Sequence, residues 1–347
     1  MSKPSDGRSS SIPDALRRAL LSWYGRHKRD LPWRRDRDLY RVWVSEIMLQ
    51  QTRVAAVLEH YHAFLHAFPA LERLAASSQE KVLARWSGLG YYRRARMLHQ
   101  AAGKVMSEAG GVIPGAQDEL RKLPGVGRYT AAAIASIAFG EPVAVVDGNV
   151  ERVLSRLDGK PRSDAAAWKR AQELLDCRHP GDWNQAMMEL GATVCTPRSP
   201  QCRVCPLRTW CRAPGAETGR PRPGRQQVPS VRNLIARGDR IFLVQRPPDA
   251  AKMADMWELP ECSSSAVGKT LPREVCVLRH SITDTEYEVR VLRLGLRALG
   301  AKQKRAGRWV RQREAFDLPL TGLTQKILRR VSLPDELSSI VQKPVLN

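Results

Sequence analysis

Residues 122–153 read KLPGVGRYTAAAIASIAFGEPVAVVDGNVERV, and the N-terminal part of the chain is organised around this stretch. Gly125 and Gly127 flank Val126 just before a run of good helix formers from Thr130 to Phe139. Glycine permits positive φ angles and lets a partner approach the backbone closely. The first N–H groups of a helix that follows such a turn suit a phosphate. The stretch predicts either a phosphate-binding hairpin between two helices or a simple turn.

A carboxylate lies near the end of the same stretch. Asp147 follows the apolar run VAVV (143–146) and precedes Gly148 and Asn149. Burial at the end of an apolar run would partly remove the carboxylate from water, so its charge would act strongly on anything bound nearby. Asp is also a preferred N-cap residue. Asp147 is therefore a candidate catalytic group, with helix capping as the alternative.

A second carboxyl falls within a predicted helix from about Tyr40 to Phe64, where apolar residues recur at helical spacing. Glu46 and Gln50 lie four residues apart on a polar face of this helix. Such a face is usually solvated, but Ile47 and Met48 crowd Glu46. Apolar surroundings favour the protonated form of a carboxyl. Glu46 is therefore a candidate general acid near neutral pH.

Seven cysteines are present, and an odd number argues against a disulfide framework. Four of them form the pattern Cys195-x6-Cys202-x2-Cys205-x5-Cys211. Thiolates at such spacings close on one metal centre, either tetrahedral zinc or a cubane iron–sulfur cluster. Zinc sites more often contain two C-x2-C knuckles, and only Cys202 and Cys205 form one here. The spacing favours the larger cluster, and four unrelated buried thiols is the alternative.

The formal net charge of +22 and the pI of about 10.3 predict a polyanionic partner. Nucleic acid is the first expectation and an anionic membrane surface the second. No segment approaches the roughly 20 apolar residues that span a bilayer. Residues 1–11 lack the apolar core of a secretory signal and are predicted to be a disordered tail. We therefore expect a cytoplasmic protein that is not membrane-bound.

The composition predicts a multidomain chain. Residues 12–213, which include the cysteine loop 195–211, have helical patterns and no clear strand pattern, which predicts an all-α domain. In residues 214–229, seven of sixteen residues are Pro or Gly, which is typical of a linker. Residues 230–345 are predicted to form a separate α+β domain. Its expected elements are strands at 231–236, 240–245 and 286–297 and a closing helix at 325–331.

Six motifs occur in order along the chain. They are SEIMLQQT (45–52), GLGYY (88–92), LPGVGRYTA (123–131), VDGN (146–149), NQAMMELG (184–191) and the cysteine loop. Together they resemble the MutY family of adenine DNA glycosylases, in the iron–sulfur branch of the helix-hairpin-helix glycosylase superfamily. The resemblance is dense over residues 12–213 and looser beyond them.

The resemblance implies a monofunctional DNA N-glycosylase of base excision repair. Such an enzyme flips adenine out of a duplex in which it is mispaired with 8-oxoguanine or guanine, and hydrolyses its N-glycosidic bond. Glu46 is implied to protonate adenine N7, and Asp147 to stabilise the cation at the deoxyribose or to trap it covalently. Tyr129 and Asn149 are implied to support Asp147. We expect a monomer whose partner is double-stranded DNA, in the cytoplasm of a bacterium and associated with its nucleoid.

Further contacts follow from the same resemblance. The cofactor is implied to be a [4Fe-4S] cluster held by Cys195, Cys202, Cys205 and Cys211. The residues implied to contact DNA are Gln50, Gln51, Leu89 and Tyr91 around the mispair, Gly125, Val126 and Gly127 in the hairpin, and Thr283 in the C-terminal domain.

The C-terminal domain resembles the family's Nudix-like recognition domain through the segment MWELP (256–260). No Nudix box is visible, so we do not expect nucleotide hydrolysis. The family reads 8-oxoguanine with a Phe-Ser-His loop, whereas this chain has Ile282, Thr283 and Asp284. Thr283 still offers a hydroxyl, but Asp284 adds a negative charge near DNA. Discrimination of the opposite base is therefore expected to be weaker.

Two other functions remain open on sequence grounds. A glycosylase with lyase activity, like endonuclease III, would need a lysine amine at position 129 to form a Schiff base, and this chain has Tyr129. A non-catalytic DNA-binding protein would use the hairpin and the cysteine loop for docking only. The presence of both Glu46 and Asp147 argues against this second alternative.

Overall fold

The computed structural model describes residues 12–216, 224, 226–262, 273–282 and 284–331. The predicted tail at 1–11 and Thr283 lie outside the described residues. The chain divides into two compact units, one formed by residues 1–61, 70–75 and 100–221 and the other by 62–69, 76–99 and 222–347. Among the described helices, none is long and apolar enough to cross a membrane.

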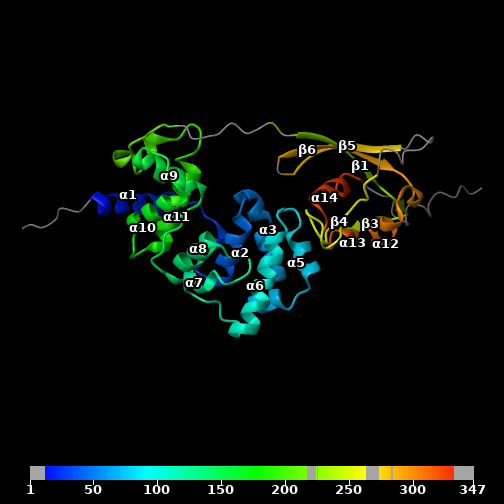
Figure 1. Ribbon diagram of the computed structural model, residues 1–347, viewed down its shortest axis with the longest axis horizontal. Coiled ribbons are helices and arrows are strands. Elements are labelled where there is room, and N and C mark those ends of the chain that lie inside the picture. Colours follow the sequence, from blue (N-terminus) through cyan, green and yellow to red (C-terminus); the bar gives the residue numbers. More distant parts are fainter. Residues whose placement is uncertain (1–11, 217–223, 225, 263–272, 283, 332–347) are drawn as a thin grey trace, which may run out of the picture. The chain divides into compact units, whose positions relative to one another are not determined.

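The first unit is helical throughout its described residues, which confirms the predicted all-α fold (Figure 1). Helices α3 and α6 each have part of their length in the second unit. The α-helices with residues in the first unit are α1 (Ile12–His27), α2 (Leu39–Leu49), α3 (Val54–Ala67), α4 (Leu71–Ala75), α6 (Arg93–Ala109), α7 (Gln117–Leu120), α8 (Arg128–Phe139), α9 (Gly148–Asp158), α10 (Asp164–Leu174) and α11 (Pro180–Thr193). Its 3₁₀ turns are η1 (Pro32–Arg34), η2 (Cys202–Val204) and η3 (Arg208–Trp210).

The prediction of one helix from Tyr40 to Phe64 is wrong. The chain instead leaves helical geometry after Leu49, because Gln50 has extended angles (φ −56°, ψ 114°) and Gln51 has a φ of 54°. The Gln50 side chain donates a 2.9 Å hydrogen bond to Thr130 on α8, which holds the turn from outside the helix. Gln50 and Gln51 therefore lie on a turn at the end of α2.

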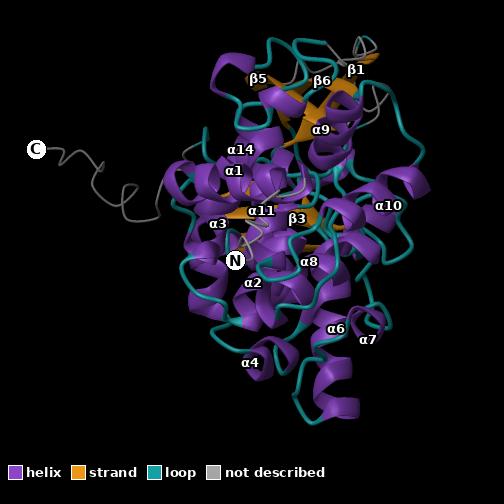
Figure 2. Ribbon diagram, turned by 90° about the vertical axis from the view of Figure 1, so that its left-hand side faces the viewer, coloured by secondary structure: helices purple, strands orange, loops and turns teal. Residues whose placement is uncertain are grey.

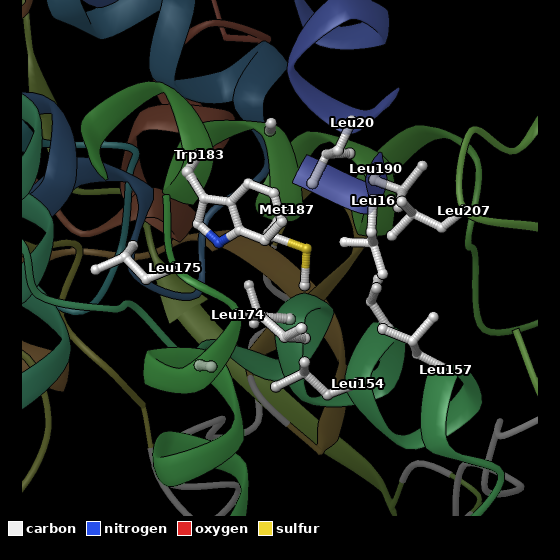
Figure 3. Packing of buried hydrophobic residues seen from close by; sticks show 14 of the residues in the cluster. Leu16, Leu20, Leu154, Leu157, Leu174, Leu175, Trp183, Met187, Leu190 and Leu207 are labelled. Atoms are coloured by element: carbon white, nitrogen blue, oxygen red, sulfur yellow. The ribbon is translucent and has the colours of Figure 1, made fainter. Parts of the chain in front are cut away.

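A buried apolar cluster joins α1, α9, α10 and α11 (Figure 3). Leu16 and Leu20 of α1 are both in it. Each large side chain that is fully buried stabilises the fold by roughly 1.5–3 kcal/mol. Other members labelled in the figure are Leu154, Leu157, Leu174, Leu175, Trp183, Met187, Leu190 and Leu207. The cluster fixes α9 and α11, which carry or contact the candidate site residues.

The second unit contains two sheets, drawn as orange strands in Figure 2. In the first sheet the order is β1-β6-β5, with β1 parallel to β6 and β5 antiparallel to it. The second sheet is antiparallel, and β3 pairs with β2, β4 and β7. The strands are β1 (Gln226–Asn233), β2 (Ala236–Arg237), β3 (Arg240–Gln245), β4 (Trp257–Glu258), β5 (Arg273–Ile282), β6 (Thr285–Arg293) and β7 (Gly307–Arg311).

Helices complete the second unit, in agreement with a separate sheet-containing C-terminal region. They are α5 (Gln79–Trp86), α12 (Ala301–Arg305), α13 (Gln312–Ala315), α14 (Gly322–Leu328) and the 3₁₀ turn η5 (Leu296–Ala298). Strand β1 begins at Gln226, inside the stretch predicted as a linker. Strands β4, β5 and β7 were not predicted, and β6 ends at Arg293 rather than at 297.

Candidate active site

Glu46 lies on α2 and is only 5% exposed, among the fully buried Val44, Ile47 and Met48. Burial raises the pKa of Glu46 to about 7, and the charge of Asp147 adds to the rise. A hydrogen bond from Tyr129 and the charge of Arg34 act in the opposite direction. The predicted apolar environment of this carboxyl is therefore confirmed. The carboxyl titrates near neutral pH, so it can give and take back a proton there.

Tyr129 lies at the start of α8, with its hydroxyl beside Glu46. The hydroxyl donates a 3.1 Å hydrogen bond to Oε2 of Glu46 and lies 3.2 Å from Sδ of Met188. Burial and the charges of Glu46 and Asp147 raise the pKa of Tyr129 well above its usual value. The phenol therefore keeps its proton and acts as a donor at neutral pH.

Asp147 is the N-cap of α9, so the capping interpretation of this residue is correct. Its Oδ1 accepts hydrogen bonds from the backbone N–H groups of Asn149 (2.9 Å) and Val150 (2.8 Å), and its Oδ2 accepts one from the Asn149 amide (2.9 Å). The cap does not exclude a catalytic role, because the charge of Asp147 also raises the pKa of Glu46 and the two carboxyls therefore act on each other. Three donors hold this carboxylate in one orientation.

The segment that leads to Asp147 is extended and is held by two side-chain amides. Asn184, which is 2% exposed, accepts from the Val145 N–H (3.1 Å) and donates to the Val143 carbonyl (2.8 Å). Gln172 accepts from the Ala144 N–H (2.9 Å) and donates to a neighbouring carbonyl. These side chains replace the partner strand that the segment lacks, so the backbone polar groups are satisfied.

Arg152, which sequence reasoning missed, supports Asn149. Its guanidinium donates to Oδ1 of Asn149 (2.8 Å), to the Gly191 carbonyl (2.7 Å) and to the Cys195 carbonyl (2.8 Å). A hydrogen-bonded path therefore runs from Asp147 through Asn149 and Arg152 to the start of the cysteine loop. The position of Arg152, one helical turn after Asn149, is the signal that was available in the sequence.

Gly191 lets α11 approach the start of α9. A Cβ at this position would lie 2.6 Å from Cβ of Asn149 and 3.0 Å from its carbonyl oxygen. Real side chains essentially never come so close, so a residue larger than glycine would displace Asn149.

Glu189, also missed, is a fully buried carboxylate on α11. It accepts hydrogen bonds from Arg29 (2.7 and 2.8 Å) and from Arg34 (2.9 Å). Burial opposes its ionisation, but the hydrogen bond with Arg29 and the charge of Arg34 outweigh burial, so the pKa of Glu189 is lowered. Through this pair Arg34 is fixed where its charge also lowers the pKa of Glu46.

The four cysteines of the loop lie near one another. Burial raises the pKa of the Cys205 thiol to about 11, and Cys195, Cys211 and Cys202 add to the rise. Within the residues that the structure describes, no three His, Cys, Asp or Glu side chains are arranged to hold a single metal ion.

Arg156 holds the beginning of the cysteine loop. This guanidinium, 3% exposed, donates to Sγ of Cys195 (3.2 Å) and to the carbonyls of Thr196 (2.7 Å) and Pro197 (3.0 Å). A cationic donor beside a sulfur stabilises a thiolate, so this contact suits a thiolate ligand.

The hairpin between α7 and α8 is formed, but its two glycines differ. Gly125 has a φ of 75° and uses the positive φ that glycine permits, whereas Gly127 has φ −82° and ψ 178° and does not. Gly127 is the N-cap of α8 and makes no side-chain capping bond, and a Cβ there would meet nothing within 4 Å. Val126 is buried and anchors the turn. Neither the backbone angles nor the packing of Gly127 requires a glycine.

The remaining predicted DNA contacts lie in different places. Gln50 and Gln51 are in the first unit, on the turn after α2. Leu89 and Tyr91 belong to the second unit, where Leu89 is buried and Tyr91 is 47% exposed with a φ of 47°. The Arg94 guanidinium carbon lies 5.5 Å from the centre of the Tyr91 ring, within the range of a cation–π contact.

The chain is similar to known DNA repair proteins. Residues 44–176 match the HhH-GPD superfamily of base excision DNA repair proteins. The adenine DNA glycosylase of Homo sapiens is 53% identical over 214 residues, which are 57% of this chain and 39% of the relative. The adenine DNA glycosylase of Arabidopsis thaliana is 39% identical over 304 residues, which are 73% and 48%. The chain therefore spans less than half the length of these two curated relatives.

The chain is also similar to solved structures of a DNA glycosylase and of endonuclease III. A thermostable thymine-DNA glycosylase is 30% identical with a TM-score of 0.54, over 58% of this chain and 95% of that one. A trapped covalent intermediate of endonuclease III with DNA is 26% identical with a TM-score of 0.50, over the same shares.

Proposed function

Because this chain belongs to the HhH-GPD superfamily of base excision DNA repair proteins, we propose that it is an adenine DNA glycosylase acting on adenine opposite 8-oxoguanine or guanine. The observation that carries the proposal is the contrast between two coupled carboxyls. Glu46 is buried with a pKa of about 7, whereas Asp147 accepts three hydrogen bonds at a helix N-terminus. Glycoside hydrolysis needs one carboxyl to give a proton and another to stay charged.

Glu46 is the proton donor in this proposal. With a pKa of about 7, a large fraction of the carboxyl is protonated at neutral pH and gives its proton to N7 of the flipped adenine. The neutral base is a better leaving group than an adenine anion. The Tyr129 hydroxyl then stabilises the Glu46 carboxylate left behind, because it donates to Oε2.

Asp147 stabilises the positive charge that develops on the deoxyribose as the bond to adenine breaks. Its three donors fix the carboxylate before the reaction, so no reorganisation is needed when the charge appears. Adenine leaves with the proton from Glu46, a water molecule supplies the hydroxyl group to C1′, and the second proton of that water returns to the Glu46 carboxylate. Asn149 acts through Asp147 as a positioning residue.

Tyr129 makes the enzyme monofunctional. Strand cleavage by a glycosylase with lyase activity requires an amine that forms a Schiff base with C1′. Tyr129 carries a phenol whose hydroxyl is engaged with Glu46, and a phenol cannot form a Schiff base. We therefore expect abasic DNA, and not nicked DNA, as the product.

DNA would be held at several places. The hairpin Gly125-Val126-Gly127 would bind a backbone phosphate, and the open space beside Gly127 leaves room for it. Gln50, Gln51, Leu89 and Tyr91 would fill the space around the mispair. The C-terminal sheet unit would act as a Nudix-like recognition domain, and Thr283 would contact 8-oxoguanine.

The donor set of the cysteine loop fits an iron–sulfur cluster. Cys195, Cys202, Cys205 and Cys211 would hold a [4Fe-4S] cluster through their thiolates, with Arg156 stabilising the sulfur of Cys195. Such a group, when bound, would supply a covalent cross-link of the loop. We further propose that the protein is a monomer acting on nucleoid DNA in a bacterial cytoplasm.

Base excision on end-labelled duplexes tests the proposal. Adenine is placed opposite 8-oxoguanine, guanine or thymine, and each product is read with and without alkali. Cleavage that needs alkali, on the first two duplexes, and its loss in Glu46→Gln with duplex binding retained, are the expected results. Breaks without alkali would indicate the lyase instead. No excision by the unmodified protein, with binding intact, would indicate a docking protein.

A further inference from the structure

A groove of about 520 Å³ opens in the first unit between α8, α10 and the extended segment before Asp147. Its lining residues include the apolar Val143 and Ala144, together with Trp168, Arg128, Lys169 and Glu173. No residue of the carboxyl pair or of the cysteine loop lines it. The groove is therefore distinct from the candidate active site, although Arg128 immediately follows the hairpin glycine Gly127.

Arg128 is held in place by stacking. Its guanidinium carbon lies 3.9 Å from the centre of the Trp168 ring. Trp168 itself cannot turn easily, because it is 8% exposed and its indole N–H donates to Asp164 (3.2 Å). A guanidinium stacked on an aromatic face keeps its N–H groups directed outward in its own plane, where they match the oxygens of a phosphate.

The charged groups of Arg128 and Lys169 are available to bind an anion. Among the described residues, neither Arg128 nor Lys169 has a hydrogen-bond or ion-pair partner for its charged group, and both side chains are exposed. The nearby acids are engaged elsewhere, because Glu173 pairs with Arg170 (3.1 Å) and Glu141 accepts from the Gln117 N–H (2.8 Å). Within the described part of the chain, the groove therefore presents two cations without an ion-pair partner beside apolar surface.

We propose that Arg128 and Lys169 form a second phosphate site for the DNA backbone, next to the phosphate held by the hairpin. The inference rests on the proposed DNA-binding function and extends the contact surface from α8 to α10. The side chain of Arg128 starts from the residue after Gly127, so an anion in the groove lies beside the hairpin's own phosphate site. Stacking on Trp168 organises the guanidinium before DNA arrives, which lowers the entropic cost of binding.

The salt dependence of DNA binding tests this site. The slope of log Kobs against log salt is negative, and each phosphate contact that is lost reduces its magnitude by about 0.9 for duplex DNA. We expect Arg128→Ala and Lys169→Ala each to reduce this magnitude by about that amount with an undamaged duplex, and the double variant by about twice as much. Arg128→Lys should keep the slope but weaken binding, because it keeps the charge and loses the bidentate geometry.

Arg26→Ala, which removes an exposed cation at the end of α1, is the matched control and should leave the slope unchanged. Melting temperatures of all variants are compared, so that a folding defect is not mistaken for a lost contact. An unchanged slope in the Arg128 and Lys169 variants, or an equal change in Arg26→Ala, would overturn the inference. Stabilisation by inorganic phosphate that Arg128→Ala abolishes, without any change in DNA slope, would also overturn it, since the groove would then bind free phosphate.

The two proposals fail in different ways. If the unmodified protein shows neither salt-dependent duplex binding nor adenine excision, the proposed function is contradicted. If the unmodified protein binds and excises but the variants keep its slope, only the proposal of a second phosphate site is contradicted.

Discussion

The Tyr129 hydroxyl donates a 3.1 Å hydrogen bond to Oε2 of Glu46, a carboxyl that is 5% exposed and lies near Asp147. This bond favours the charged form of Glu46, whereas burial and Asp147 favour the protonated form. The pKa of about 7 is the balance of these opposing effects. Substitutions at 129 and at 147 should therefore move the pH dependence of catalysis in opposite directions.

Tyr129→Phe should shift the alkaline limb of the pH–rate profile to higher pH. The phenol lowers the pKa of Glu46, so its removal raises that pKa, and the acid stays protonated to higher pH. A hydrogen bond to a charged group contributes about 1.5 kcal/mol or more, which corresponds to a shift of about one pH unit. Single-turnover excision rates from pH 5 to 9 measure the limb. A limb that stays in place or moves down contradicts the assigned donor role of Tyr129.

Asp147→Asn should shift the same limb to lower pH and reduce the maximal rate. The negative charge of Asp147 raises the pKa of Glu46, so its neutralisation lowers that pKa. The loss of the charge that stabilises the cation should cost roughly 100-fold or more in rate. Asn is itself a good N-cap, so α9 should remain capped and the melting temperature should change little. A large fall in melting temperature would show that the rate loss reflects misfolding.

Glu46→Gln should stabilise the protein at alkaline pH while abolishing excision. The folded-state pKa of Glu46 is raised from 4.5 to about 7. Below pH 4.5 the carboxyl is protonated in both the folded and the unfolded state, so its ionisation does not reduce the free energy of unfolding there. The cost of ionisation grows as pH rises from 4.5 and is complete above the folded pKa. The shift corresponds to at most roughly 3 kcal/mol.

Urea unfolding at pH 5 and pH 8.5 checks this prediction. Glu46→Gln should gain more stability relative to the unmodified protein at pH 8.5 than at pH 5. Glu119→Gln would serve as the control, because it makes the same chemical change at a side chain that is 54% exposed and pairs with the exposed Lys122. An equal gain at both pH values would mean that the ionised form of Glu46 carries no burial cost.

Local sequence signals were sufficient for several parts of the site. Asp147 could be recognised both as a cap and as a candidate carboxylate, because both properties depend on neighbours within three residues. The apolar environment of Glu46 could be inferred from Ile47 and Met48, which are buried as expected. The hairpin followed from its glycines, although only Gly125 uses a positive φ.

Long-range contacts account for what the sequence did not predict. The break after Leu49 contains neither Pro nor Gly, and it is held by Gln50 donating to Thr130, eighty positions away. The spacing of Arg152 from Asn149 could be read locally, but its bond to the Gly191 carbonyl depends on α11, thirty-nine positions away. Strand β5 was missed because a register shift between Glu274 and Cys276 interrupts its alternation.

Gly191→Ala should impair catalysis by displacing Asn149. The new Cβ would lie 2.6 Å from Cβ of Asn149, so α9 or α11 must shift, at a cost of roughly 1–3 kcal/mol in stability. Asn149 donates to Oδ2 of Asp147, so a shift of Asn149 leaves the catalytic carboxylate less well oriented and should lower the excision rate at least about tenfold. Single-turnover rates and melting temperatures are measured on the same preparations.

Gly103→Ala on α6 is the matched control, because a Cβ at that helical glycine meets nothing within 4 Å. It should raise stability slightly, by about 0.5–1 kcal/mol, and leave the excision rate unchanged. If Gly191→Ala lost stability but excised adenine at the normal rate, Asn149 would not be needed to orient Asp147. If both variants lost activity equally, the effect would belong to helix stability in general and not to the contact between α11 and the start of α9.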